Sequence, residues 1–156
     1  MMPNNFSTER FLLCRAAGCW CALSLQGLGE VMRPQPLEKL GRLPEFVDGL
    51  SVIRGKPLPV VNLPRLLTGK NSRPSAQERF VTAISEGHKL ALRVDEVGSI
   101  RELETSIWSN LPSLLEEVHQ EHVAAVGSLQ GGLLVLLRRS NLISADDWES
   151  LQAEPA

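Results

Sequence analysis

The stretch Phe46-Val-Asp-Gly-Leu-Ser-Val-Ile-Arg-Gly-Lys-Pro-Leu-Pro-Val-Val-Asn-Leu63 joins two short apolar segments through an Arg-Gly turn. Short apolar runs on either side of such a turn are typical of two β-strands. Gly55 can adopt backbone angles that are closed to most residues, and Pro57 and Pro59 restrict the chain as it enters the second strand. We therefore expect a stiff turn that holds the cation of Arg54 at a fixed point on a β scaffold.

Similar β patterns continue along most of the chain, with no obvious internal repeat in the sequence. The predicted strands cover residues 10–16, 19–25, 30–34, 50–54, 58–63, 80–85, 89–97, 100–104, 124–129 and 133–138. Gly18, Glu86-Gly87 and Gly131-Gly132 are expected at hairpin tips. Many short strands of this kind favour closed or nearly closed β-barrels over an open sheet.

Helical signals are few and short. Residues 64–67 and 112–118 each predict a short helix, the second with a proline in its first turn. Ser144 is placed to cap a C-terminal helix that extends to about Gln152, with Trp148 and Leu151 on one face. We expect an N-terminal tail over residues 1–9, a β domain over residues 10–143, and a short helix and tail over residues 144–156.

Length, composition and charge limit the possible functions. A chain of 156 residues with 43% hydrophobic content can form one domain, or two small subdomains that share a core. The net charge of −2, without a run of basic residues, disfavours nucleic acid as the main partner. The N-terminus lacks an export signal, and the longest apolar run, Leu133–Leu137, is too short to span a bilayer. We therefore expect a cytoplasmic protein without direct membrane insertion.

The three cysteines lie close together, at Cys14, Cys19 and Cys21. An odd number in one predicted hairpin argues against a disulfide framework and fits a reducing compartment. The Cys-x-Cys spacing is not a usual zinc motif, so we expect buried structural thiols.

Candidate chemistry is sparse. His119 and His122 have a spacing that could share a helix face, and Glu116 or Glu121 could supplement them as metal ligands. A small metal-dependent enzyme is therefore one alternative, although a solvated loop or helix end is the simpler interpretation. No phosphate-binding loop or nucleophile elbow is present, so the sequence predicts neither a catalytic residue nor a cofactor.

A barrel that binds single-stranded nucleic acid is the other alternative. Such a protein needs aromatic platforms and a basic groove. This chain has no Tyr, four Phe and three Trp, with a slightly acidic balance, so the sequence favours this function less.

The opening stretch also resembles the signature of the CheW-like family. The matching positions are Gly49, Ile53, Arg54, Gly55, Pro59, Val60, Val61 and Leu63. The resemblance extends to residues 11–13, 28–32, 90–97 and 126–137, and so covers nearly the whole chain in order. It implies a mainly β fold with two intertwined, five-stranded, SH3-like barrel subdomains, short connecting helices and a short C-terminal helix.

The resemblance also implies a function. CheW-like proteins are non-catalytic cytoplasmic adaptors in chemotaxis, and they couple methyl-accepting chemoreceptors to a CheA-type histidine autokinase. The expected partners are therefore the cytoplasmic tip of a chemoreceptor and the regulatory domain of such a kinase, within a membrane-associated receptor array. The kinase-facing residues cannot be assigned from the sequence.

Six residues are expected to bind the receptor. They are Arg54, Glu30, Val31, Leu50, Val52 and Gly55. The guanidinium of Arg54 is suited to holding a carboxylate or several carbonyl groups of a partner. The alternative for Arg54 is an internal ion pair with Glu30 or Asp48, and the alternative for the apolar residues is ordinary core packing.

Three positions depart from the family pattern. Val52 replaces a common Asn, Asn62 stands where Asp is frequent, and Pro64 replaces a common Arg. Asn can bond to the neighbouring backbone and hold a turn, whereas Val cannot. We therefore interpret the chain as a divergent paralogue, serving an array that controls surface motility or second-messenger output.

Overall fold

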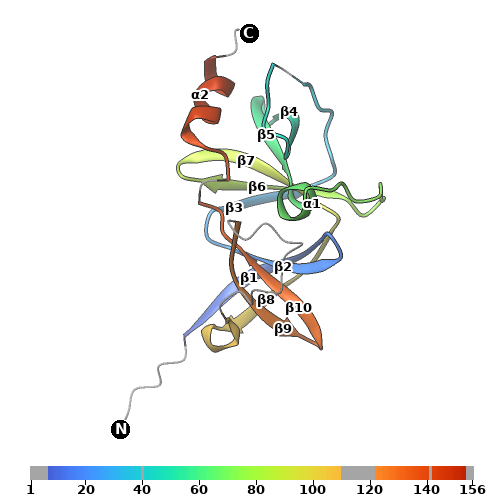
Figure 1. Ribbon diagram of the computed structural model, residues 1–156, viewed down its shortest axis with the longest axis vertical. Coiled ribbons are helices and arrows are strands. Elements are labelled where there is room, and N and C mark those ends of the chain that lie inside the picture. The colour runs from blue at the N-terminus through green and yellow to red at the C-terminus, as the bar shows by residue number, and fades with distance from the viewer. Residues whose placement is uncertain (1–6, 40, 110–121, 141, 154–156) are drawn as a thin grey trace.

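Ten strands form two five-stranded sheets, which lie one above the other along the long axis of the molecule (Figure 1). The structure is a computed structural model that describes residues 7–39, 41–109, 122–140 and 142–153. The strands are β1 (Thr8–Ala16), β2 (Cys19–Ser24), β3 (Leu28–Met32), β4 (Val47–Ile53), β5 (Lys56–Asn62), β6 (Arg79–Ser85), β7 (His88–Val94), β8 (Glu96–Glu104), β9 (Val123–Leu129) and β10 (Gly132–Leu137). Each predicted strand is present, which confirms the mainly β fold.

The two sheets exchange segments of the chain. The first sheet has the order β8-β1-β2-β10-β9, and the second has the order β3-β6-β7-β5-β4. The chain leaves the first sheet after β2, builds the whole second sheet with β3 to β7, and returns with β8. This confirms that the two subdomains are intertwined.

Each sheet is closed into a barrel by one isolated bridge. Ser109 pairs with Val126 of β9 and closes the first sheet, with N···O distances of 2.8 and 3.0 Å. Glu38 pairs with Leu50 of β4 and closes the second, with both N···O distances at 2.8 Å. We refer to the two closed sheets as the first and second barrels.

The second barrel repeats the first, strand by strand. β6 and β7 correspond to β1 and β2, β4 and β5 to β9 and β10, and β3 to β8. In both barrels the third pair in the strand order, β2–β10 or β7–β5, is parallel and the other three pairs are antiparallel. The closing bridges are also equivalent, because Leu50 lies four residues before Arg54 and Val126 lies four residues before Gln130. The repeat is thus plain in the strand pairing, although the sequence does not show it.

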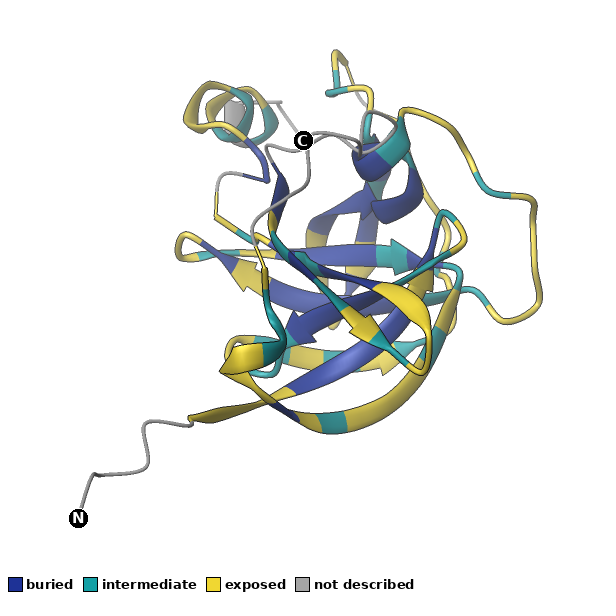
Figure 2. Cartoon of the chain, turned by 60° about the horizontal axis from the view of Figure 1, so that its bottom comes forward, coloured by how far each residue is buried: buried dark blue, intermediate teal, exposed yellow. Residues whose placement is uncertain are grey.

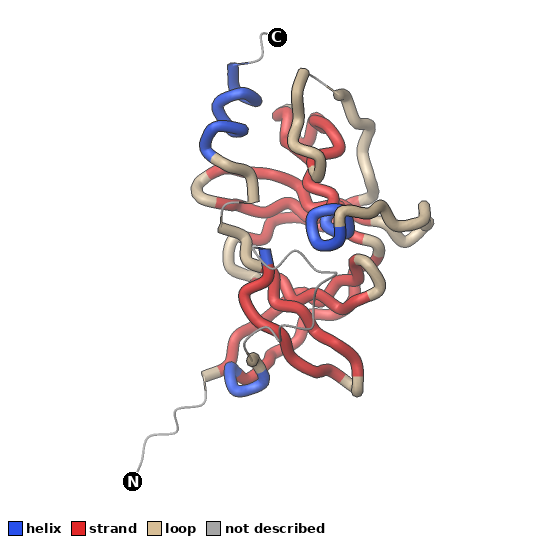
Figure 3. The backbone as a smooth tube through the Cα atoms, in the orientation of Figure 1, coloured by secondary structure: helices blue, strands red, loops and turns tan. Residues whose placement is uncertain are grey.

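Short turns, drawn in tan between red strands, join the strands of four hairpins in the described residues (Figure 3). Their two-residue turns are Ala17-Gly18, Arg54-Gly55, Glu86-Gly87 and Gln130-Gly131, and both residues of each turn have positive φ. Turns of this kind match the right-handed twist of the flanking strands. The last turn lies one residue earlier than predicted, because Gly132 already belongs to β10.

Several predicted strand boundaries differ by two to four residues, and the largest difference lies between β7 and β8. The expected strand 89–97 ends at Val94, and β8 begins at Glu96. Asp95 breaks the strand because its Oδ2 accepts hydrogen bonds from the backbone N–H of Ala17 at 3.2 Å and from the hydroxyl of Ser72 at 2.8 Å. These distant partners cannot be found from local sequence patterns.

Three apolar clusters build the core (Figure 2). The largest combines side chains of both barrels, such as Leu23 of the first with Leu92 of the second. A smaller cluster fills each barrel, around Phe11 in the first and around Phe80 in the second. These two phenylalanines occupy equivalent positions on β1 and β6, so the packing of side chains inside the two barrels follows the structural repeat.

The cysteines are free, and two of them face each other in the core. Cys14 and Cys21 are register partners, and both are buried, whereas Cys19 is half-buried. Burial raises the pKa of the Cys14 thiol to about 12, and the nearby charge of Asp95 adds to this effect. Burial likewise raises the pKa of Cys21. These observations agree with the expected structural thiols.

We predict that iodoacetamide labels the native protein at Cys19 alone among the three thiols, because the reagent attacks thiolates and the buried thiols stay protonated. Mass spectrometry of digests should show labels on Cys14 and Cys21 only after denaturation. Stability should also fall above the ordinary thiol pKa, because the unfolded chain then releases protons that the folded chain retains. Labelling of Cys14 in the folded state would contradict this prediction.

The helices are short, as expected. α1 (Leu63–Thr68) is capped by Asn62, whose side chain accepts a hydrogen bond from the N–H of Arg65 at 3.2 Å. α2 (Ala145–Ala153) is capped by Ser144, whose hydroxyl accepts from the N–H of Asp147 at 3.1 Å. The 3-10 helix η1 covers Thr105–Ile107. In the part of the chain that the structure describes, no helix combines the length and apolar character that a membrane crossing requires.

The face of α2 that was predicted to be apolar packs against the body of the protein. Trp148 and Leu151 contact the large core cluster, and the Trp148 ring stacks on the imidazole of His88 with ring centroids 4.3 Å apart. The helix predicted over residues 112–118 lies outside the described residues.

Candidate functional site

Arg54 and Glu30 form a bidentate ion pair on the surface. The Nε of Arg54 donates to Oε1 of Glu30 at 3.1 Å, and its Nη2 donates to Oε2 at 2.6 Å. The side chains remain 72% and 43% exposed, respectively. The two predicted binding residues therefore pair with each other while both stay accessible to a partner.

The backbone positions the two side chains from opposite edges of the second sheet. Arg54 is the first residue of the β4–β5 turn, where its φ is 53° and Gly55 follows with a φ of 78°. Glu30 lies in a bulge of β3, where Gly29 and Glu30 together oppose the single residue Thr82 of β6. β-Bulges redirect side chains. The pair thus joins the outermost strands β3 and β4 across one end of the barrel.

The electrostatics favour the charged form of this pair. The hydrogen bonds from Arg54 have the largest effect and lower the pKa of the Glu30 carboxyl. Partial desolvation opposes them, and the charges of Arg54 and Lys89 lower the pKa further. The hydrogen bonds to Glu30 in turn raise the pKa of Arg54. The ion pair therefore persists at neutral pH and weakens only when acid protonates Glu30, below the ordinary pKa of a glutamate. The charges of two cations, Arg54 and Lys89, thus act on the one carboxylate of Glu30.

The apolar residues predicted beside the pair lie in two separate places. Leu50 and Val52 line a shallow hollow of about 220 Å³ together with Pro36, Glu38 and Pro57. Val52 is 65% exposed there. Val31 is also exposed, but it lies opposite Val81, whose side chain belongs to the core between the barrels. The structure thus brings Arg54 to Glu30 and Leu50 to Val52, and places Val31 with neither apolar residue.

The equivalent end of the first barrel has a different chemistry. By strand register, Trp20 corresponds to Lys89, and Leu13 corresponds to Thr82. Leu13 and Trp20 pack in the apolar cluster that fills the first barrel. The positions equivalent to Glu30 and Arg54 hold the uncharged residues Ser99 and Gln130, so the architecture does not require an ion pair there.

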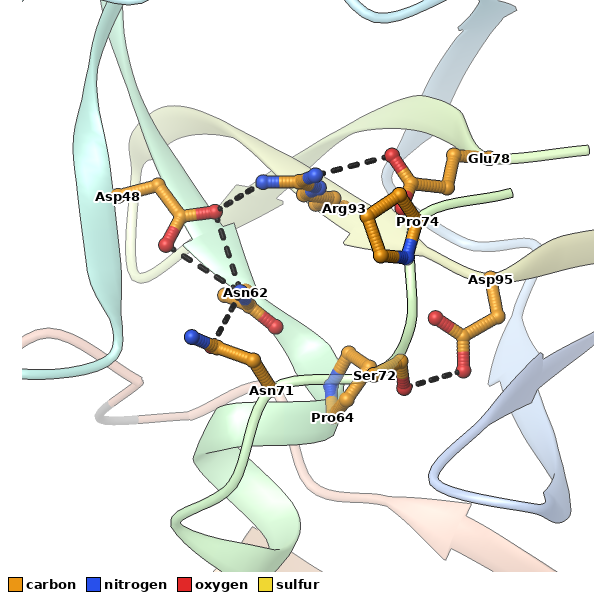
Figure 4. Close-up of a pocket in the computed structure, with 9 residues that line it drawn as sticks. All are labelled: Asp48, Asn62, Pro64, Asn71, Ser72, Pro74, Glu78, Arg93 and Asp95. Carbon is orange, nitrogen blue, oxygen red and sulfur yellow. Dashed lines mark hydrogen bonds and ion pairs between the residues drawn. The ribbon is translucent and has the colours of Figure 1, made fainter. Parts of the chain in front are cut away.

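Asp48, the other predicted partner of Arg54, bonds elsewhere (Figure 4). Its carboxylate pairs with Arg93 at 2.8 Å, and Arg93 also pairs with Glu78 at 2.9 Å. These residues line a polar pocket of about 330 Å³ at the start of β4, and its remaining lining residues are Asn62, Pro64, Asn71, Ser72, Pro74 and Asp95. Charged and polar groups drawn in the figure bond to one another across the pocket, so we interpret it as a junction that ties the 69–78 loop to the second barrel.

Two of the departures from the family pattern are explained at this junction. The Nδ2 of Asn62 donates to both carboxylate oxygens of Asp48, at 3.2 and 3.1 Å, while its Oδ1 caps α1. An Asp at position 62 could cap the helix but would place a second carboxylate beside Asp48. Pro64 lies in the first turn of α1, where a missing N–H costs no helical hydrogen bond.

The histidine pair gives no metal site within the described residues. His119 lies outside them, and no group of three metal-binding side chains occurs in the part that the structure describes. His122 is buried, and its ring lies 6.1 Å from the ring of Phe46.

Sequence reasoning missed Lys89 and Thr82 at the charged end of the second barrel. Both lie on the hairpin formed by β6 and β7, more than 50 residues after Glu30 in the chain. A structural alignment of the two barrels identifies them, because they replace Trp20 and Leu13. The sequence alone offers no such signal.

Comparisons with known proteins agree with the fold. The family model of the CheW-like domain matches residues 10–147. The crystal structure of the scaffolding protein TtCheW from Thermoanaerobacter tengcongensis is similar, with a TM-score of 0.80 and 18% sequence identity, over 94% of this chain and 95% of that chain. No curated protein matches the sequence.

Proposed function

Because the chain belongs to the CheW-like family, we propose that it is a non-catalytic scaffold that holds a chemoreceptor beside a CheA-type histidine kinase. It acts in the cytoplasm and joins membrane-associated receptor arrays. Its contribution is geometric, since weak contacts to two partners in an array raise their effective concentration without a chemical step.

The exposed Arg54–Glu30 pair is the observation that supports receptor binding by the second barrel. The first barrel has the uncharged Ser99 and Gln130 at the equivalent positions, so the fold itself does not require these charges. A surface ion pair also contributes little to stability. A planar guanidinium with one carboxylate and Lys89 beside it suits a receptor helix that presents an acidic group and backbone carbonyls.

The predicted apolar residues extend this contact. Leu50 and Val52 line a hollow on the outer face of β4, two to four residues before Arg54 in the sequence. An amphipathic helix can place an apolar side chain there while its polar side meets Arg54. Gly55 follows Arg54 in the turn and belongs to the same proposed surface. Val31 is exposed on β3, apart from Leu50 and Val52, and would form a separate contact.

We propose that the array controls surface motility or second-messenger output. This hypothesis now depends on Val52 alone, because Asn62 and Pro64 have local structural roles in capping α1. Val52 is exposed beside the proposed contact and can select a different receptor. Tight binding to receptors of swimming arrays alone would contradict the hypothesis.

We predict that Arg54→Ala weakens binding of a receptor hairpin fragment by about tenfold, the loss expected for one charge-assisted hydrogen-bonding group. The melting temperature should barely change, because both side chains are largely exposed. Titration calorimetry with the receptor fragment and with the kinase regulatory domain measures both interfaces, and only the first should respond.

A matched pair of neutral substitutions provides the control. Glu30→Gln breaks the proposed binding pair, whereas Glu45→Gln breaks the surface pair with Arg65 at 3.1 Å. Only Glu30→Gln should weaken receptor binding. A large fall in melting temperature for Arg54→Ala, with unchanged receptor affinity, would assign Arg54 a structural role instead.

A further inference from the structure

We infer that Thr82 is a positioning residue, whose hydroxyl holds the backbone of Glu30 so that its carboxylate meets Arg54. The inference rests on the proposed receptor contact. It adds a buried residue that would touch neither the receptor nor the kinase. Thr82 is 1% exposed, and its Oγ1 accepts a hydrogen bond from the N–H of Glu30 at 2.7 Å.

The hydroxyl contacts β3 at the point where the bulge interrupts the regular pairing. Leu28 pairs with Ala83 and Val31 pairs with Val81, so Gly29 and Glu30 must share the space opposite Thr82. Bulges leave a residue without its regular partner. At this bulge the N–H of Glu30 donates to the Thr82 side chain.

Gly29 allows the close approach that this contact requires. A Cβ on Gly29 would lie 2.4 Å from Oγ1 of Thr82, well inside any tolerated contact. Glycine before Glu30 and threonine opposite it therefore fit each other. Because β3 is an outermost strand of the second sheet, β6 is its strand partner there, and this contact ties Glu30 to that partner.

The first barrel indicates that the bulge itself does not need a hydroxyl. There Gly98 and Ser99 occupy the same bulge, between the pairs Val97–Cys14 and Ile100–Leu12, and oppose Leu13. The side chain of leucine has no group that could accept a hydrogen bond. The same backbone shape thus forms with an apolar residue where no ion pair depends on it, and the threonine occurs where Glu30 must be aimed at Arg54.

The test compares Thr82→Val, which replaces the hydroxyl by a methyl group, with Thr82→Ser, which keeps it. In the free protein, the NMR signal of the Arg54 Nε–H reports the ion pair, and Glu30→Gln supplies the reference for a broken pair. We expect wild type and Thr82→Ser to protect this proton from exchange, and Thr82→Val to resemble Glu30→Gln. Receptor affinity should fall by about fivefold for Thr82→Val and stay within about twofold for Thr82→Ser.

The outcomes separate this inference from the proposed function. If Thr82→Val melts like wild type and keeps both the protected Nε–H and the receptor affinity, the positioning role is wrong. If Glu30→Gln and Arg54→Ala bind the receptor like wild type, the receptor proposal fails, while the Nε–H comparison still decides the role of Thr82. Thr82→Ala removes the hydroxyl without adding a methyl group to the bulge, and it repeats the comparison should Thr82→Val not fold.

Discussion

Arg54→Glu is expected to weaken receptor binding by about 100-fold, because it reverses the charge at the proposed contact and places two carboxylates side by side. In the wild type, the positive charges of Arg54 and Lys89 both act on the carboxylate of Glu30. The substitution leaves Lys89 as the remaining cation of this group. An acidic group on the receptor would then meet repulsion where it now meets a guanidinium.

The double variant Glu30→Arg with Arg54→Glu separates pairing from partner contact. It restores an ion pair between the same two positions with the charges exchanged. If the pair serves only to join β3 to β4, the exchange should recover receptor affinity to near the wild-type value. If Arg54 itself contacts the receptor, affinity should stay at least about tenfold below wild type.

Circular dichroism and titration with the kinase regulatory domain provide the controls. Both variants should melt close to wild type, because the positions are exposed and the turn backbone is unchanged. Arg54 has a positive φ of 53°, and Glu occupies the equivalent turn position at Glu86 with a φ of 52°. The fold therefore already accommodates Glu in this turn geometry. Full recovery of receptor affinity in the double variant would rule out direct recognition by Arg54.

The sequence predicted what local patterns encode. The Arg54-Gly55 turn, the helix cap at Ser144 and the number of strands follow from short-range rules that the structure confirms. The break at Asp95 did not follow, because its cause is a pair of hydrogen bonds from Ala17 and Ser72, at 78 and 23 residues' separation. The long-range hydrogen bonds of this one carboxylate thus end the strand that the local pattern predicted across residues 89–97.

The candidate site was likewise predictable only at residues that a local pattern or the family motif marks. Arg54 and Glu30 were found separately, through the family motif, and were also considered as alternative partners of one another. The internal pairing and the partner contact are compatible, because Arg54 and Glu30 bind each other within the chain while both side chains stay exposed. Thr82 and Lys89 stayed hidden because their importance shows only when the two barrels are compared, and the sequences of the two barrels have diverged beyond an obvious repeat.

Gly49→Ala is expected to lower the free energy of unfolding by about 3 kcal/mol, through overpacking and backbone strain. Gly49 has a φ of 153°, and a Cβ there would lie 2.7 Å from the backbone oxygen of Glu38 and 3.2 Å from its carbonyl carbon. A flexible side chain could move away from such a contact, but this neighbour is backbone. Glu38 also forms the bridge to Leu50 that closes the second barrel, so the strain falls on the closure itself.

Urea denaturation of Gly49→Ala beside Gly132→Ala measures this effect. A Cβ on Gly132 would meet only the oxygen of Leu129, at an ordinary 3.5 Å, so that control should change stability by less than about 1 kcal/mol. The first barrel sharpens the test, because Ala125 occupies the position equivalent to Gly49, and its φ is not positive. If Gly49→Ala were as stable as wild type, the second barrel could close as the first does, around an alanine. A loss near 3 kcal/mol would instead show that this motif glycine is needed because the closing segment of the second barrel passes directly over it.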